Sequence, residues 1–136
     1  MIFDLMNEKI VKAILETIPI EITVIDENDE VIGWNQHETR IFKRLNSVLK
    51  LNFRDCHPKD SLEKVEKIVN QMKSGERDKA RFWINLPIEG KPHMILIEFY
   101  ALRDENGKYI GCLECTQDIE DLRHLEGQNR LLDEIK

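Results

Sequence analysis

The sequence predicts one α+β domain, in which short helices cover one face of a five-stranded antiparallel sheet and helices at both chain ends flank it. Apolar and polar residues alternate, as in strands, over two segments before residue 36 and three segments after residue 79. Around these segments the apolar spacing is helical. The 136 residues, 41% of them hydrophobic, suffice for a single core.

The first elements are a helix and a hairpin. Residues 1–18 predict an amphipathic helix, because apolar residues such as Ile10 and Ile14 recur at helical spacing between charged ones, and Pro19 ends it. From Ile20 the apolar period is two, a turn follows at residues 26–29, and residues 30–35 predict the second strand.

The middle of the chain predicts helices. Residues 36–58 favour two short helices, one with Ile41, Phe42 and Leu45 on a face and one with Val48, Leu49 and Leu51. A longer helix is expected from Asp60, where Asp60 and Glu63 predict a capping box, to Gly75.

Three strands and a last helix complete the pattern. Residues 80–86, 93–103 and 109–117 predict an antiparallel meander with connections at residues 88–91 and 104–107. Leucines at helical spacing then predict an exposed amphipathic helix. We therefore divide the chain into an N-terminal helix (1–18), a core (19–118) and a C-terminal signalling or dimerisation helix (119–136).

Composition excludes several classes of protein. The net charge of -6 disfavours nucleic acid as a partner. The longest apolar runs have four residues, as at residues 94–97, so no membrane span is expected, and a signal peptide is not visible. We expect a cytoplasmic protein whose three cysteines are reduced thiols.

Several segments, in order and spacing, resemble the PAS domain family across residues 17 to 125: Ile22–Asp26 with Val31–Asn35, Phe53–Pro58, Arg103–Gly111 and Gln117–Ile119. More narrowly, Cys56–Pro58, Phe82–Ile84 and Leu125–Gly127 with Arg130–Leu132 resemble a bacterial and archaeal PAS subgroup. Members of that subgroup often carry a hemerythrin-like, iron-binding domain. Such a domain is not in this sequence, so its function is not transferred.

The expected ligand cavity lies between the sheet and the short helices. Strand alternation puts Gly111, Leu113 and Cys115 on one sheet face, and the resemblance implies that this face borders the cavity. The candidate pocket residues are Trp34, Phe42, Phe53, Cys56, His57, Trp83, Leu113 and Cys115.

The resemblance also implies a sensory function. The leading hypothesis is a PAS-type module that binds a small apolar ligand or dimerises, and passes a conformational change through its C-terminal helix. Gln117 and Asp118 form the exit junction, where Asp118 could cap that helix or hold it to the sheet. The terminal helices are apolar enough to pair in a homodimer, although the N-terminal helix could instead pack on its own sheet.

The alternative is a haem-bearing gas or redox sensor with His57 or His37 as the iron ligand. Catalysis by Cys56 and His57 is not expected, because no base and orienting group accompany them. Cys112 and Cys115 lie three residues apart on a strand and face opposite sides, so no shared metal is expected. Phe53 stands where light-sensing relatives have their flavin-binding cysteine, and no enzyme signature is present.

Overall fold

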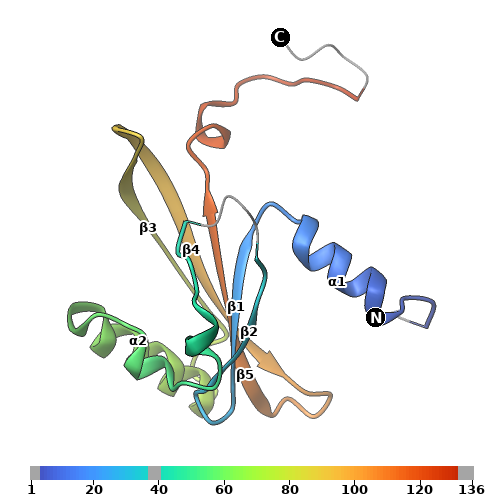
Figure 1. Cartoon of the computed structure of the whole chain (residues 1–136), viewed down its shortest axis with the longest axis vertical. Helices are drawn as coiled ribbons and strands as arrows, with labels where there is room; N and C mark the ends of the chain where they lie inside the picture. The colour runs from blue at the N-terminus through green and yellow to red at the C-terminus, as the bar shows by residue number, and fades with distance from the viewer. Residues whose placement is uncertain (1–3, 37–40, 132–136) are drawn as a thin grey trace.

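The computed structural model describes residues 4–36 and 41–131 (Figure 1). Its elements are, in chain order, α1 (Glu8–Thr17), β1 (Glu21–Asp26), β2 (Val31–Trp34), the 3₁₀ helices η1 (Asn46–Val48) and η2 (Phe53–Asp55), α2 (Lys59–Ser74), β3 (Lys79–Ile88), β4 (Lys91–Arg103), β5 (Tyr109–Asp118) and the 3₁₀ helix η3 (Leu122–His124). None of these helices combines the length and apolarity needed to cross a bilayer.

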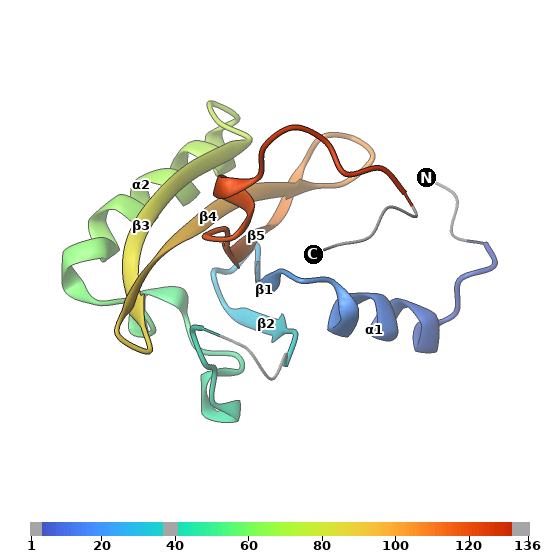
Figure 2. The same ribbon diagram turned by 90° about the horizontal axis from the view of Figure 1, so that it is seen from above.

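The five strands form one antiparallel sheet in the order β2-β1-β5-β4-β3, which confirms the predicted fold class. The last strand, β5, lies at the centre, because it pairs with β1 on one side and β4 on the other. β3 and β4 form a long hairpin whose tight turn is Glu89-Gly90. Figure 2 shows that α2 lies along one face of the sheet, whereas α1 extends away from the sheet.

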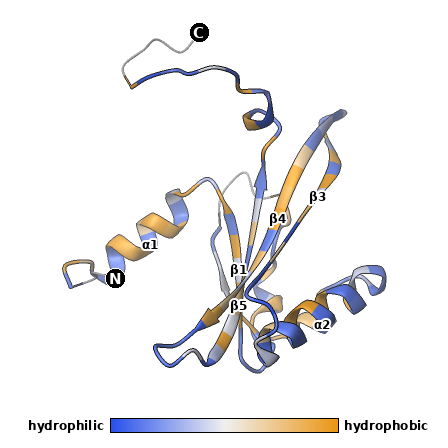
Figure 3. Cartoon of the chain, turned by 180° about the vertical axis from the view of Figure 1, so that it is seen from behind, coloured by the Kyte–Doolittle hydropathy of each residue, from blue (hydrophilic) through white to orange (hydrophobic). Residues whose placement is uncertain are grey.

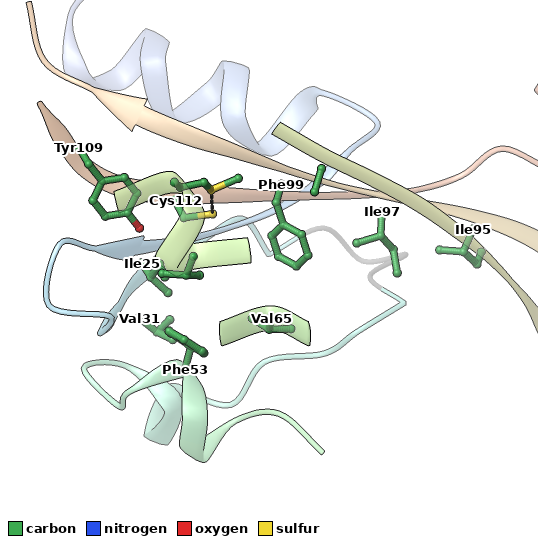
Figure 4. Packing of buried hydrophobic residues seen from close by; sticks show 12 residues of the cluster. Ile25, Val31, Phe53, Val65, Ile95, Ile97, Phe99, Tyr109 and Cys112 are labelled. Atoms are coloured by element: carbon green, nitrogen blue, oxygen red, sulfur yellow. Dashed lines mark hydrogen bonds between the residues drawn. The ribbon is translucent and has the colours of Figure 1, made fainter. Parts of the chain in front are cut away.

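The core lies between the sheet and α2. Phe99, Ile97 and Ile95 of β4 belong to one buried cluster with Val65 of α2 and Phe53 of η2. Figure 4 shows Phe99 pointing from the sheet toward Val65. Burial of each such side chain contributes about 1.5–3 kcal/mol. This packing fixes α2 and η2 against the sheet.

α2 differs in one detail from the prediction. It begins at Lys59 with Pro58 as N-cap and no side-chain cap, so the expected capping box at Asp60 and Glu63 is wrong. Asp60 lies within the first turn, where its charge suits the helix dipole. The helix ends as predicted at Gly75, whose φ of 83° lies in the left-handed region that glycine tolerates.

The short helices lie later in the chain than predicted. Residues 41–45 form a bend and an irregular segment rather than the expected helical turn, and residues 37–40 lie outside the described part. The helical turns are η1 and η2. In the irregular segment, the backbone amides of Ile41 and Phe42 donate to the carboxylate of Glu21 in β1.

α1 begins at Glu8, because the Asn7 side chain accepts a hydrogen bond from the Ile10 amide and caps the helix there. Residues 4–7 therefore lie outside the helix, contrary to the prediction, and residues 1–3 lie outside the described part. No residue of α1 is buried, and the helix projects from the sheet on the side away from α2 (Figures 1 and 3). It therefore does not pack back on its own sheet.

The buried amide of Asn35 joins α1 to the sheet. Its Nδ2 donates to the carbonyls of Leu15 and Ile20, both at 2.8 Å, and its Oδ1 accepts from the Ile22 amide at 2.8 Å. The side-chain carboxylate of Glu16 also accepts from the Gln36 amide. Polar contacts thus fix one end of α1 while its apolar stripe stays exposed.

The predicted helix over residues 119–136 is wrong for residues 119–131, which make only the single turn η3. Leu122 and Leu125 are 56% and 75% exposed, so the apolar stripe has no surface to pack against in one chain. An unsupported short helix is marginal in water. Gly127, at a φ of 62°, also interrupts helical geometry. Residues 132–136 lie outside the described part.

A cluster of charges joins the hairpin to the helical layer. Asp29, in the turn between β1 and β2, has a side chain only 8% exposed. It lies 2.9 Å from Nη1 of Arg54 in η2 and 2.7 Å from Nζ of Lys73 in α2. The Phe53 amide also donates to the Asp29 carbonyl at 2.8 Å. One residue therefore connects the hairpin, η2 and α2.

Asp29→Asn should destabilise the fold by about 1–2 kcal/mol, because it removes the charge that pairs with two cations while asparagine still tolerates the left-handed backbone. Urea denaturation followed by circular dichroism measures this. Glu89→Asn is the matched control, since Glu89 also has a positive φ but lies on an exposed turn. Equal stability of the two variants would contradict the role assigned to Asp29.

Candidate functional site

A groove of about 680 Å³ opens between the sheet and the helical layer. One wall is β3 and β4, which contribute Phe82, Ile84, Ile97 and Phe99. The other wall includes Ser61 and Val65 of α2. The segment 41–44 borders the groove, and Phe42 lies in this segment. A groove of this size with aromatic and aliphatic walls fits a small apolar molecule.

A smaller enclosed hollow of about 30 Å³ lies beside the groove, among Ile25, Val31, Phe53 and Cys112. Figure 4 shows the side chains that surround it, from β1, β2, β5 and η2. Six residues border both spaces: Arg44, Cys56, His57, Val65, Phe99 and Glu114. These six form the boundary between an open groove and a closed interior.

The segment 41–44 is held in place by Glu21 of β1. The Glu21 side chain is almost fully buried, and its carboxylate accepts hydrogen bonds from the backbone amides of Ile41 and Phe42. Burying a carboxylate costs free energy because it loses its hydration, and the two amide donors offset part of that cost. This anchor fixes the position of Phe42 and Arg44 at the groove.

Cys56 and His57 form separate hydrogen bonds to the backbone. His57 Nδ1 lies 2.8 Å from the Phe53 carbonyl, and because a carbonyl only accepts, Nδ1 carries the proton of this hydrogen bond. In the neutral ring, Nε2 then has the lone pair. The Cys56 thiol donates to the Asn52 carbonyl at 3.6 Å, and burial raises its pKa. A protonated thiol is a poor nucleophile, so this pair does not resemble a catalytic dyad.

Arg44 and Glu114 bring opposite charges to the boundary. Nη2 of Arg44 lies 3.7 Å from the Glu114 carboxylate, and both side chains are less than one fifth exposed, at 18% and 17%. Nε of Arg44 donates to the Thr23 hydroxyl at 3.4 Å. Both distances are long for hydrogen bonds.

Of the predicted pocket residues, four lie on the groove or the hollow: Phe42, Phe53, Cys56 and His57. Trp34 packs against the core but lines neither space. His37 lies outside the described residues. Whether the four bind a ligand remains a prediction.

Trp83, Leu113 and Cys115 lie on the opposite face of the sheet, so the predicted orientation of β5 is wrong. Cys112 and Glu114 face the helical layer, because they pair with Ile25 and Thr23 of β1, which line the same hollow. Leu113 and Cys115 point the other way, and Trp83 is 59% exposed. Residues 113 and 115 therefore share a face, as strand alternation predicts, but it is the face opposite the groove.

The cysteines of β5 face opposite sides, as their spacing predicts. The Cys112 thiol contacts the Met72 sulfur at 3.7 Å, and burial raises its pKa to about 12. Burial likewise raises the pKa of Cys115 to about 11. Within residues 4–36 and 41–131, no three His, Cys, Asp or Glu side chains gather as a metal site.

A second groove, of about 580 Å³, lies at the exit of β5 and includes Gln117 and Asp118. Asp118 pairs with His93 of β4 at 2.6 Å, and its other oxygen accepts from the Glu120 amide at 2.9 Å. The carboxylate of Glu120 in turn accepts from the Met94 amide. Asp118 therefore ties the exit segment to the sheet.

Ile41 lines both this groove and the larger one.

Sequence reasoning missed Arg44, Glu114 and Glu21. A charged strand residue between two apolar neighbours is a usable indication of a functional side chain, and both Glu21 and Glu114 fit that description. Arg44 has no such local pattern, since its position at the groove depends on the remote anchor Glu21.

Comparisons with known proteins agree with this fold. The family model described as PAS domain matches residues 11–120. A crystal structure of a C-terminal domain from Streptococcus mutans is 30% identical, with a TM-score of 0.79 over 87% of this chain and 89% of that one. No curated protein matches the chain significantly.

Two further crystal structures share the fold at lower identity. The PAS domain of a protein from Colwellia psychrerythraea is 17% identical, with a TM-score of 0.61 over 83% of this chain and 97% of that one. The PAS domain of BvgS from Bordetella pertussis is 15% identical, with a TM-score of 0.62 over 85% and 90%. The match of the family model over most of the sequence, on a sheet of the same architecture, shows that this chain belongs to the PAS domain family.

Proposed function

We propose that the chain is a sensory module that binds one small apolar ligand in the groove between β3, β4 and α2. The observation that supports this proposal is the groove itself, because its aromatic walls are accessible from solvent while the rest of the core is closely packed. Phe82 and Ile84 are 36% and 39% exposed there, which is unusual for side chains on the core face of a sheet. A ligand would cover them.

The segment 41–44 supplies a route from the groove to the exit of β5. Phe42 borders the ligand groove, and Ile41 borders both grooves. The backbone amides of Ile41 and Phe42 donate to the Glu21 carboxylate of β1. Glu21 in turn pairs with Thr116 of β5, which lies two residues before Asp118. A ligand that shifts Phe42 would therefore act on the junction that ties the exit segment to the sheet.

The apolar stripe of α1 supports the homodimer as part of this function. Ile10, Val11, Ile14 and Leu15 are 36–47% exposed, and Figure 3 shows hydrophobic residues along the helix. Since Asn35 fixes the helix away from its own sheet, a second copy is the partner we propose for this stripe.

Ligand binding is testable with N-phenylnaphthylamine, a neutral apolar dye that fluoresces in dry pockets. We expect saturable binding of one dye per chain, lost in Ser61→Trp because the indole fills the groove. Ser74→Trp is the control, since Ser74 lies at the other end of α2 and makes the same kind of hydroxyl contact with a carbonyl three residues earlier. Equal dye binding by the two variants would contradict the site.

Self-association is testable by sedimentation equilibrium. The wild type should form dimers at micromolar concentration, and Ile14→Glu should make it monomeric because a charge then interrupts the stripe. Ile110→Glu is the control, as Ile110 is equally exposed, at 45% against 44%, but lies on β5. A wild-type monomer at high micromolar concentration would remove the dimer from the proposal.

A haem-bearing sensor is the second candidate, and one observation favours it. His57 borders the groove, and its Nδ1 is bonded to a carbonyl, which leaves Nε2 available as an iron ligand. Haem would supply binding of diatomic gases or a redox change. Titration with haemin should then give a Soret band that His57→Ala abolishes and His93→Ala keeps. Absence of the band in the wild type removes this candidate.

A further inference from the structure

We infer that the ligand of the groove carries a carboxylate, and that Arg44 binds it. The inference rests on the proposed function, because it names the chemical class of the ligand for the same groove. It follows from the bonding of Arg44, the charges along the groove and the shape of its apolar walls.

Arg44 makes too few short contacts for a guanidinium that is 18% exposed. Among the described residues its polar contacts are Thr23 at 3.4 Å and Glu114 at 3.7 Å, whereas charge-assisted hydrogen bonds measure about 2.7–2.9 Å. Donors that leave water without gaining good partners raise the free energy of the folded state.

Arg54 provides a comparison within the same layer. Its side chain is more exposed, at 34%, yet its Nε lies 2.6 Å from Glu66 and its Nη1 lies 2.9 Å from Asp29. Within the described part of the chain, Arg54 therefore has two carboxylates at short range, and Arg44 has one at long range. A carboxylate at short range is the partner that Arg44 does not have among these residues, and a planar guanidinium can bind one through two parallel hydrogen bonds.

The charges along the groove favour an acid over an amine. Among the described residues that line it, Lys43 and Arg44 are cations and Glu114 is a carboxylate. The groove thus carries an excess of positive charge in a chain whose net charge is -6. Glu114 is already paired with Arg44, so an incoming ammonium group would have to compete with that guanidinium.

The apolar walls indicate the rest of the ligand. Phe82 and Phe99 lie side by side with ring centroids 5.6 Å apart, and Phe42 borders the same space. Flat aromatic surfaces of this kind pack well against a planar ring or a methylene chain. An arylalkanoic acid combines such a body with the carboxylate that Arg44 requires.

The test uses three compounds that share one apolar body: naphthylacetate, naphthylethanol and naphthylethylamine. Isothermal titration calorimetry on the wild type should show that the acid binds at least about tenfold more tightly than the alcohol, and that the amine binds most weakly. In Arg44→Gln the preference for the acid should fall to about twofold or less, and Arg44→Lys should keep part of it. Circular dichroism checks that each variant is folded, and the readout is the ratio of acid to alcohol affinity within one variant.

Arg81→Gln is the matched control, because Arg81 also pairs with a glutamate, Glu98 at 2.8 Å, but on the opposite face of the sheet. It should keep the full preference for the acid. Equal affinities for acid and alcohol, a preference for the amine, or an acid preference that survives in Arg44→Gln would overturn this inference while leaving the groove a ligand site. If neither these compounds nor the neutral dye binds, the proposed function fails as well.

Discussion

The ionic cluster around Asp29 is the constraint on which the rest of this structure depends. A hairpin turn, a 3₁₀ helix and the C-terminal half of α2 are far apart in sequence, and one almost buried carboxylate holds all three. With one end of α2 fixed in this way, its other end, at Ser61, borders the groove. The space between sheet and helix is therefore closed at one end by salt bridges and close packing and open at the other.

The sheet has an unusual distribution of polarity that follows from this arrangement. On β1 and β5, Glu21, Thr23 and Glu114 point toward the helical layer, while Ile22 and Leu113 point away from it. An inner face normally carries the apolar set. Here the inner carboxylates have partners, since Glu21 accepts hydrogen bonds from backbone amides and Glu114 pairs with Arg44.

The fold could be predicted from the sequence because the turn residues mark the ends of the strands, and the spacing of apolar residues distinguishes the strands from α2. The candidate site could be predicted only in part. Phe42, Phe53, Cys56 and His57 border the groove or the hollow. The resemblance implied that the face with Leu113 and Cys115 borders the cavity, and strand alternation by itself groups residues by face without saying which face is buried. The predicted C-terminal helix is wrong because its leucines have helical spacing but are exposed. A short amphipathic segment is stable as a helix only where another surface covers its apolar side.

The position of Ile41 between the two grooves has a thermodynamic consequence. If occupancy of the ligand groove alters the affinity of the exit groove for an output protein, then that protein must alter ligand affinity by the same factor, because coupling between two sites is reciprocal. The downstream component would then set the sensitivity of the sensor. Measured in isolation, the domain would respond over a different concentration range from the one it shows when its output protein is bound.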